Sequence, residues 1–299
     1  MTAPRSHNCA GRLWRRLLGG LLAACLLLLL AAALKQGALA DLLRRPLKHE
    51  AGFAMHMIDV GQGQALLLTC GGQTAMVDAG PADTSRQVVD HLLKEGVRRL
   101  DYLFVTHPHS DHFGGIKRVL ETVGADVLII PEYLSEEAAL TTAGDWIGKT
   151  ATQIAVTHTN DRYTLGDAVI TVLHPEAGNG IDDMNDLSLV LLVEYAGRRL
   201  LITGDLTEQE ESSLPAIGPV DVLQVAHHGS YTSSTKAFLE DVRPRYALIS
   251  CGKNNEYGHP HNVVIARLED VGARIHRTDE DGTLLVRILE GQIAVTNEH

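Results

Sequence analysis

Three histidines and one aspartate stand close together in the segment from Thr106 to Gly115, which reads THPHSDHFGG. Imidazole and carboxylate groups are suitable ligands for zinc and, with more oxygen donors, for manganese or iron. In extended chain His107 and His109 project to the same side, whereas Asp111 and His112 follow around the turn toward a second position. One short segment can therefore supply ligands to two metal ions.

Further ligand-type residues follow predicted strands elsewhere in the chain. Asp205 ends LLITGD, where a carboxylate can bridge two cations, and His227 and His228 end VLQVAHH. Asp78 follows MV, and we expect it to orient a ligand imidazole through a hydrogen bond instead of binding metal itself. A polar residue after an apolar strand usually only starts a loop, but several strands that end this way favour a dinuclear metal centre. The pattern leaves open which of the two adjacent histidines faces the metal.

Downstream residues have the chemistry to contact a phosphodiester. The hydroxyls of Ser230, Ser233 and Ser234 and the ammonium group of Lys253 are candidates for substrate binding. His259, in the segment NNEYGHP, can hydrogen-bond a phosphate or protonate a leaving oxygen, so we name it as a candidate catalytic residue.

Short apolar runs and helical periodicity indicate the elements that must position these residues. The runs FAMHMIDV, QALLLTC and TAMVDAG predict a meander of strands, and the later strands are LDYLFVTH, VLII, AVITVLH, LSLVLLVEY, RRLLITGD, DVLQVAHH, YALISCG, ARIHRT and GTLLVRI. Helices are predicted over 84–95, 115–122, 136–149, 232–242 and 262–271. Strands that cluster early and later alternate with helices suit an α/β (α+β) fold of two packed sheets flanked by helices.

The first part of the chain differs from the rest in composition. Residues 17–34 carry no charge and follow four arginines, which is typical of a cleaved signal peptide or a single membrane anchor. We therefore divide the chain into a targeting segment with its linker, 1–52, and a body, 53–299, long enough for one large domain. The body is expected outside the cytoplasm, in the periplasm or at the cell surface, either secreted or anchored to the inner membrane.

The chain is acidic, with 26 Lys and Arg against 37 Asp and Glu and a formal net charge of −11. Extended binding of DNA normally requires a basic track, because neutralisation of phosphates supplies most of the affinity. Lys236, Arg243, Arg245 and Lys253 are the residues from which a small basic rim near the site could form.

The order of the segments VDAG, THPHSDH, TGD, HHGS and YGHP resembles the metallo-β-lactamase superfamily of metallohydrolases. It is most similar to the C-terminal metallohydrolase domain of the DNA-uptake competence protein ComEC, from HMIDVGQGQALLL to RTDEDGTLLVRI, and includes NDLSLVL and HHGSYTSS. This resemblance implies an αββα sandwich of two mixed β-sheets, with a metal site at one edge, and a nuclease that degrades one DNA strand outside the membrane.

The resemblance also implies roles for individual residues. The first metal would be bound by His107 and His109, and the second by three residues with Asp205 bridging: Asp111, which is also a candidate catalytic residue, His112, and one of His227 and His228. Where many members of the superfamily place a third histidine on the first metal, this chain has Asn185 and Asp186, as the ComEC-like branch does. Zinc and manganese, and a resting state with a single metal, therefore all stay open.

Three functions are compatible with these patterns. The favoured one is an exported or membrane-anchored, metal-dependent phosphodiesterase or deoxyribonuclease that acts on single- or double-stranded DNA with two divalent ions, Zn or Mn. The alternative is a hydrolase of a small phosphoester or thioester, such as a phosphocholine ester or a nucleotide. A non-catalytic metal-binding subunit is disfavoured because the ligand set is intact, and no protein partner can be deduced.

Overall fold

The computed structural model describes residues 52–135, 147, 149–150, 152–175 and 183–298. These belong to the second of two compact units, which begins at Pro46. The apolar segment 17–34 lies outside the described residues. In the part of the chain that is described, no helix combines the length and the apolar character needed to cross a membrane.

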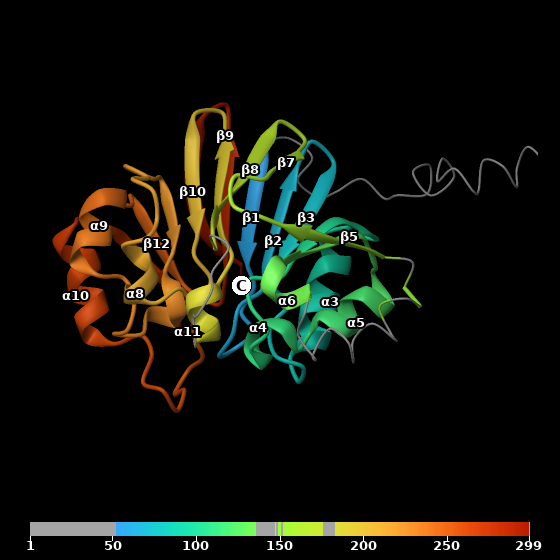
Figure 1. Cartoon of the computed structure of the whole chain (residues 1–299), viewed down its shortest axis with the longest axis horizontal. Helices are drawn as coiled ribbons and strands as arrows, with labels where there is room; N and C mark the ends of the chain where they lie inside the picture. Colours follow the sequence, from blue (N-terminus) through green and yellow to red (C-terminus); the bar gives the residue numbers. More distant parts are fainter. Residues whose placement is uncertain (1–51, 136–146, 148, 151, 176–182, 299) are drawn as a thin grey trace, which may run out of the picture. The chain divides into compact units, whose positions relative to one another are not determined.

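The described body contains two mixed β-sheets (Figure 1). The strands of the first sheet are, in spatial order, β15 (Gln292–Glu298), β14 (Thr283–Leu289), β1 (Phe53–Met57), β2 (Leu66–Cys70), β3 (Gln73–Val77), β4 (Leu100–Phe104), β5 (Ala125–Pro131) and β6 (Gln153–Thr157). The strands of the second are β13 (Arg274–Arg277), β12 (Tyr246–Ile249), β11 (Val222–Gln224), β10 (Arg198–Ile202), β9 (Val190–Tyr195), β8 (Ala168–His174) and β7 (Arg162–Leu165).

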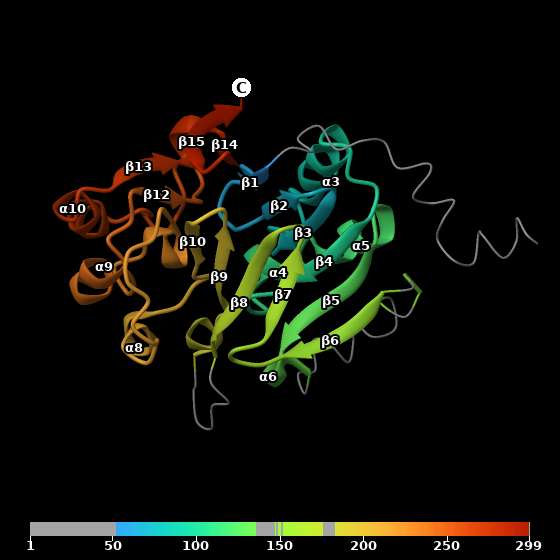
Figure 2. The same cartoon turned by 90° about the horizontal axis from the view of Figure 1, so that it is seen from above.

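Helices cover the outer faces of both sheets (Figures 1 and 2). On the side of the first sheet lie α3 (Ser85–Lys94), α4 (Ser110–Phe113), α5 (Ile116–Thr122) and α6 (Glu132–Ser135). On the side of the second lie α8 (Glu208–Glu211), α9 (Lys236–Val242) and α10 (Asn262–Asp270). The remaining turns are α11 (Thr278–Asp281) and the 3₁₀ helices η1 (Met184–Leu187) and η2 (Ala226–Gly229). This αββα sandwich of two packed mixed sheets confirms the predicted fold.

The core has three layers because most strands are buried on both faces. Alternate residues of each strand, such as Met55 and Met57 of β1, pack between the sheets against residues of the second sheet such as Ile170 and Leu191. The other face of the first sheet packs on α3 and α5, and the outer face of the second packs on α9 and α10. Among the described residues, Cys70 and Cys251 are free and buried; Cys70 lies in the central layer and Cys251 in the layer between the second sheet and its helices.

The predicted elements agree with the structure except for edge strands, one helix start and the four-residue helices α4, α6, α8 and α11, which were not predicted. Helix 232–242 begins only at Lys236, since the preceding residues form a buried turn with Ser234 at a φ of 55°. Helix 136–149 lies largely outside the described residues. The sequence patterns missed the edge strands β6, β7 and β15; β6, for example, has only the short apolar run Ile154 to Val156, and Ile154 is 47% exposed.

Candidate metal centre

The candidate site lies where parallel strands of both sheets end. Strands β3 and β4 are parallel, as are β10, β11 and β12, so the loops that follow them emerge at common edges. The loops after β3 and β4 carry Asp78 and the segment 107–112, and the loops after β10 and β11 carry Asp205 and the pair 227–228. Residues far apart in the sequence are thereby placed together.

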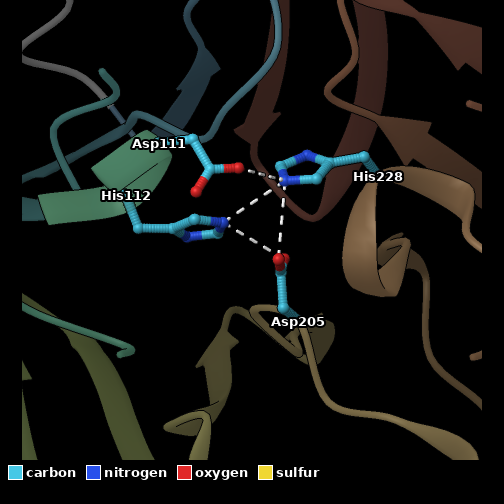
Figure 3. A group of neighbouring side chains, drawn as sticks. All are labelled: Asp111, His112, Asp205 and His228. Atoms are coloured by element: carbon cyan, nitrogen blue, oxygen red, sulfur yellow. Dashed lines mark hydrogen bonds and ion pairs between the residues drawn. The ribbon is translucent and has the colours of Figure 1, made fainter. Parts of the chain in front are cut away.

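Four of the predicted ligands converge on one point. Figure 3 shows Asp111, His112, Asp205 and His228 directed toward one another, with their nearest ligand atoms all within 4.8 Å. His112 Nε2 lies 3.2 Å from Asp205 Oδ1, and His228 Nε2 lies 3.2 Å from Asp111 Oδ2 and 3.5 Å from Asp205 Oδ2. Ligands that bind one zinc ion tetrahedrally at 2.0–2.2 Å stand about 3.3–3.6 Å apart. The four groups therefore fit a single cation.

Two of the remaining predicted ligands lie near Asp205 Oδ2, the oxygen that His228 also approaches. His107 Nε2 is 3.8 Å from Asp205 Oδ2 and 3.1 Å from His109 Nδ1. His227 Nε2 is 3.9 Å from the same Oδ2. Asp205 thus lies close to imidazoles of both predicted ligand groups, which is compatible with a bridging carboxylate.

The two adjacent histidines differ in position because of an unusual backbone. His227 and His228 have φ values of 50° and 54°, in the left-handed region that non-glycine residues seldom adopt. His228 is buried and faces Asp111 and His112, whereas the side chain of His227 is 23% exposed and approaches only Asp205 among the acidic ligands. Consecutive left-handed residues cost about 1–3 kcal/mol each and persist where the surroundings enforce them, which is common at functional sites.

Asp78 holds one ligand from behind. Its Oδ2 lies 2.7 Å from His112 Nδ1, and it accepts hydrogen bonds from Gln64 Nε2 at 2.9 Å and Thr106 Oγ1 at 2.7 Å. The backbone N–H of Thr106 donates to its Oδ1 at 2.8 Å. This network fixes the Nδ1–H tautomer of His112 and leaves its Nε2 to face the cluster.

Several positioning groups were not found from the sequence. His228 Nδ1 lies 2.8 Å from the carbonyl oxygen of Ser250, and Thr106 Oγ1 lies 3.0 Å from His107 Nδ1. Ser188 Oγ accepts a hydrogen bond from the Asp205 backbone N–H at 3.1 Å. In the sequence, these residues differ from other polar residues only in lying near the end of a predicted strand, and that position is too common to identify a positioning group.

The charges of the cluster support one another despite burial. Burial opposes ionisation of Asp205, but His112 and His228 outweigh it and hold its pKa well below the ordinary value. Burial likewise opposes the charge of His228, yet Asp205 and Asp111 raise its pKa to about 9. Asp205 Oδ1 is buried and accepts no hydrogen bond of good geometry from the described residues. Ionised carboxylates, imidazoles and this buried oxygen form a donor set that fits divalent cations.

Asn185 and Asp186 are buried on η1. The backbone N–H of Ser188 donates to the carbonyl oxygen of Asn185, and the Ser188 side chain connects this turn to His107. Ser188 Oγ lies 3.5 Å from His107 Nδ1. Asp186 is directed elsewhere, since it accepts a hydrogen bond from Thr207 Oγ1, and burial raises its pKa. Asn185 Oδ1 is buried without a hydrogen-bond partner among the described residues, so it is the amide of this pair that stays available to a ligand.

His259 lies on the open side of the cluster. Its ring stacks on His228, with centroids 6.2 Å apart, and on Tyr257, 5.6 Å away. Burial and the neighbouring imidazoles His228 and His227 lower the pKa of His259 to about 4, so its ring is neutral near pH 7. Gln62, which the sequence patterns missed, places its Nε2 3.4 Å from His259 Nδ1.

The predicted substrate hydroxyls lie deeper than expected. Ser233 and Ser234 are fully buried, and Ser230 is 4% exposed, with its Oγ accepting a hydrogen bond from Thr232 Oγ1 at 2.9 Å. The structure therefore does not bring these hydroxyls to a surface that a substrate can reach. Lys253, by contrast, is exposed in the same loop as His259.

The basic residues proposed as a rim are divided between two places. Lys236 and Arg243 lie at the ends of α9 and line a groove that also contains Glu240, Arg267 and Asp270. Arg245 stacks on the ring of Tyr246 at 5.2 Å. Lys236 and Arg243 thus have the acidic neighbours Glu240 and Asp270, and Arg245 directly precedes β12. Of the four residues, Lys253 alone lies in the loop that carries His259.

Comparison with known proteins identifies the family. A sequence profile of the metallo-β-lactamase superfamily matches residues 58–253. The chain belongs to this superfamily. It is 32% identical over 256 residues to ComE operon protein 3 of Bacillus subtilis, and 34% identical over 237 residues to competence protein ComA of Neisseria gonorrhoeae. Both alignments cover 77% of this chain but 32% of the relative, so the chain spans about a third of the length of these ComEC-like competence proteins.

Solved structures show the same fold at low identity. The metallo-β-lactamase fold protein YhfI from Bacillus subtilis matches with a TM-score of 0.51 and 14% identity, over 75% of this chain and 96% of that one. With the family profile and the converging His and Asp side chains, the chain is a metal-dependent hydrolase of this superfamily that carries a candidate divalent metal site.

Proposed function

We propose that this protein is a phosphodiesterase that hydrolyses DNA, using two divalent cations, zinc or manganese. The observation that carries the proposal is that imidazoles of both predicted ligand groups approach the Asp205 carboxylate, with His259 and Tyr257 beside the cluster. The similarity to proteins named for competence supports DNA as the substrate class.

The ligands divide naturally between two cations. Asp111, His112 and His228 would hold one cation, His107, His109 and His227 the other, and Asp205 both. Two cations at such a site lower the pKa of a bound water and hold the oxygens of a phosphoryl group for in-line displacement. Asp78 and the carbonyl of Ser250 keep the ligand imidazoles in the tautomer that this requires.

The substrate-facing side favours an unpaired nucleic-acid strand. Tyr257 and Tyr231 are 58% and 60% exposed, and they flank the imidazoles of His259 and His261. Stacking of a base on an exposed aromatic ring contributes about 1–3 kcal/mol and tolerates any base. Such contacts would add to the few phosphate contacts that this acidic protein can make. His259, neutral near pH 7, is suited to hydrogen-bond a phosphate oxygen.

A small phosphoester is the second candidate substrate. It is favoured by the net charge of −11 and by the acidic neighbours of the basic residues on α9. A compact diester would need only the cations, His259 and Lys253, and would leave the tyrosines without a role.

The N-terminal composition supports a place outside the cytoplasm. We propose that residues 17–34 direct export or anchor the protein in the membrane, so that the hydrolase body acts on the extracytoplasmic side.

The test uses the full chain, stripped of metal and reloaded with zinc or manganese. It measures cleavage of single-stranded DNA, duplex DNA and a chromogenic phosphodiester at low and moderate salt. Asp205→Asn, which keeps the side-chain shape, is the matched inactive control.

Metal-dependent cleavage of DNA by the wild type, lost in Asp205→Asn, is the expected result. Cleavage of the small diester but of neither DNA would transfer the function to a compact substrate. Absence of any phosphodiester cleavage with either metal would overturn the phosphodiesterase proposal itself.

A further inference from the structure

A second group of metal-ligand side chains lies away from the centre described above. His56, in the middle of β1, is fully buried and faces α3 instead of the inter-sheet core, since its neighbours Met55 and Met57 occupy that core. There it meets His91 of α3 and Glu298, the last residue of β15. A histidine buried on an otherwise apolar strand face requires an explanation from its partners.

The geometry of this group is compatible with a metal site. His91 Nε2 lies 3.2 Å from His56 Nδ1, which lies 3.5 Å from Glu298 Oε1, and all three ligand atoms are within 4.8 Å of one another. Ligands at 2.0–2.2 Å from a tetrahedral zinc ion stand about 3.3–3.6 Å apart. The same range, 3.2–3.5 Å, separates the ligands of the centre around Asp205.

The carboxylate is prepared for such a role. Lys94 Nζ donates to Glu298 Oε2 at 2.9 Å, which turns Oε1 toward His56. Burial opposes the charge of Glu298, but Lys94 and the two histidines outweigh it and lower its pKa. Partners of this kind orient ligating carboxylates in metal sites.

We propose that His56, His91 and Glu298 bind a third divalent transition cation, zinc by preference, that is structural and not catalytic. Two imidazoles and one carboxylate supply three protein ligands, and water would complete four-coordination. The structural role is inferred from the position of the cluster between β1, α3 and β15, away from the loops at the strand ends. The cation would join α3, β1 and β15, which are distant in sequence, and hold the edge strand β15 onto the sheet. This site does not depend on the proposed function of the centre around Asp205.

The experiment counts metal in the purified full chain after equilibrium dialysis against zinc. His91→Ala removes one ligand at a half-buried position, and Glu298→Gln removes another while keeping the side-chain shape. Lys94→Gln is the matched control, because it breaks the Lys94–Glu298 ion pair and keeps all three ligands. Thermal unfolding with and without zinc, and the visible spectrum after cobalt substitution, are recorded for each variant.

Both ligand variants should lose about one zinc per chain relative to wild type, lose part of the zinc-dependent rise in Tm, and lose one cobalt signal. Their phosphodiesterase or other hydrolytic rate should stay within about twofold of wild type, and Lys94→Gln should keep its metal. Unchanged zinc content in Glu298→Gln would overturn the proposal and leave a histidine pair with an ordinary ion pair. If the wild type and all variants lack hydrolytic activity but the zinc contents differ as expected, the proposed function fails and the proposal of a third site is supported.

Discussion

The centre around Asp205 and the cluster of His56, His91 and Glu298 use the same donor types at the same separations, yet the fold places them differently. The first lies in loops beyond the ends of parallel strands, where side chains from several loops meet and a substrate can enter. The second lies on a sheet face beneath α3, within regular elements. Donor chemistry alone therefore does not make a hydrolytic site. Placement at strand ends puts the ligands of the first cluster in loops, where binding and catalytic residues are concentrated, whereas the second cluster joins the regular elements β1, α3 and β15.

The largest expected effect separates the two clusters directly. Asp111→Ala and His109→Ala should each reduce hydrolysis to background, by more than the ~10–100-fold that loss of an outer partner costs, because each removes a predicted ligand. His91→Ala should leave kcat/KM within about twofold. Steady-state rates on metal-loaded proteins, with far-UV circular dichroism to verify folding, make the comparison. Full activity in Asp111→Ala would contradict the assignment of this residue as a ligand in a centre with two metal ions.

The next largest effect concerns His259, which lies beside the centre around Asp205 and has no counterpart at the His56 cluster. His259→Ala should lower kcat by about a hundredfold, since a group that hydrogen-bonds or protonates the substrate is lost, while zinc content stays at the wild-type level. Metal analysis beside the rate measurement decides the role. If the variant instead loses metal in proportion to its activity, His259 is a ligand and not a substrate-facing group.

A smaller effect compares the outer partners of the two clusters. Asp78→Asn should weaken metal binding about 10–100-fold, because the amide cannot replace the carboxylate opposite His112 Nδ1, which lies 2.7 Å away and is buried. Lys94→Gln removes the corresponding partner of Glu298, but the Lys94 side chain is 54% exposed and its ion pair is weak. Competition with a fluorescent chelator measures both affinities. Equal losses in the two variants would contradict this account of burial.

The sequence was informative for the metal centre because its ligands occupy one short segment and the residues that follow strands. Asp205 follows β10 of the second sheet and the segment 107–112 follows β4 of the first, so the strand pattern alone did not bring them together; the resemblance to the superfamily did. The choice between His227 and His228 could not be made from the sequence, since it depends on two consecutive left-handed residues that no pattern announces. The burial of Ser233 could not be predicted either, because a segment rich in serine and threonine is equally typical of a surface loop.

The cluster at His56 could not be predicted for a different physical reason. His91 follows His56 by 35 residues, and Glu298 is the last residue of a strand that pairs with β14, which in turn pairs with β1. Strand β15 was itself missed, because it is an edge strand with alternating exposed residues. Without its register, nothing in the sequence connects Glu298 to His56.

The smallest expected effect concerns the exposed tyrosines beside the Asp205 centre and tests whether they bind bases of DNA. Tyr257→Ala should raise KM for single-stranded DNA about fivefold, the ~1 kcal/mol expected when one base loses its stacking partner, with kcat little changed. Tyr257→Phe keeps the ring and should behave as wild type, and neither variant should change hydrolysis of the small chromogenic diester. Tyr231→Ala should act in the same direction, since that ring is also exposed and stands against His261. If both alanine variants bind DNA as well as wild type, the aromatic rim is no base platform and the compact phosphoester becomes the better substrate.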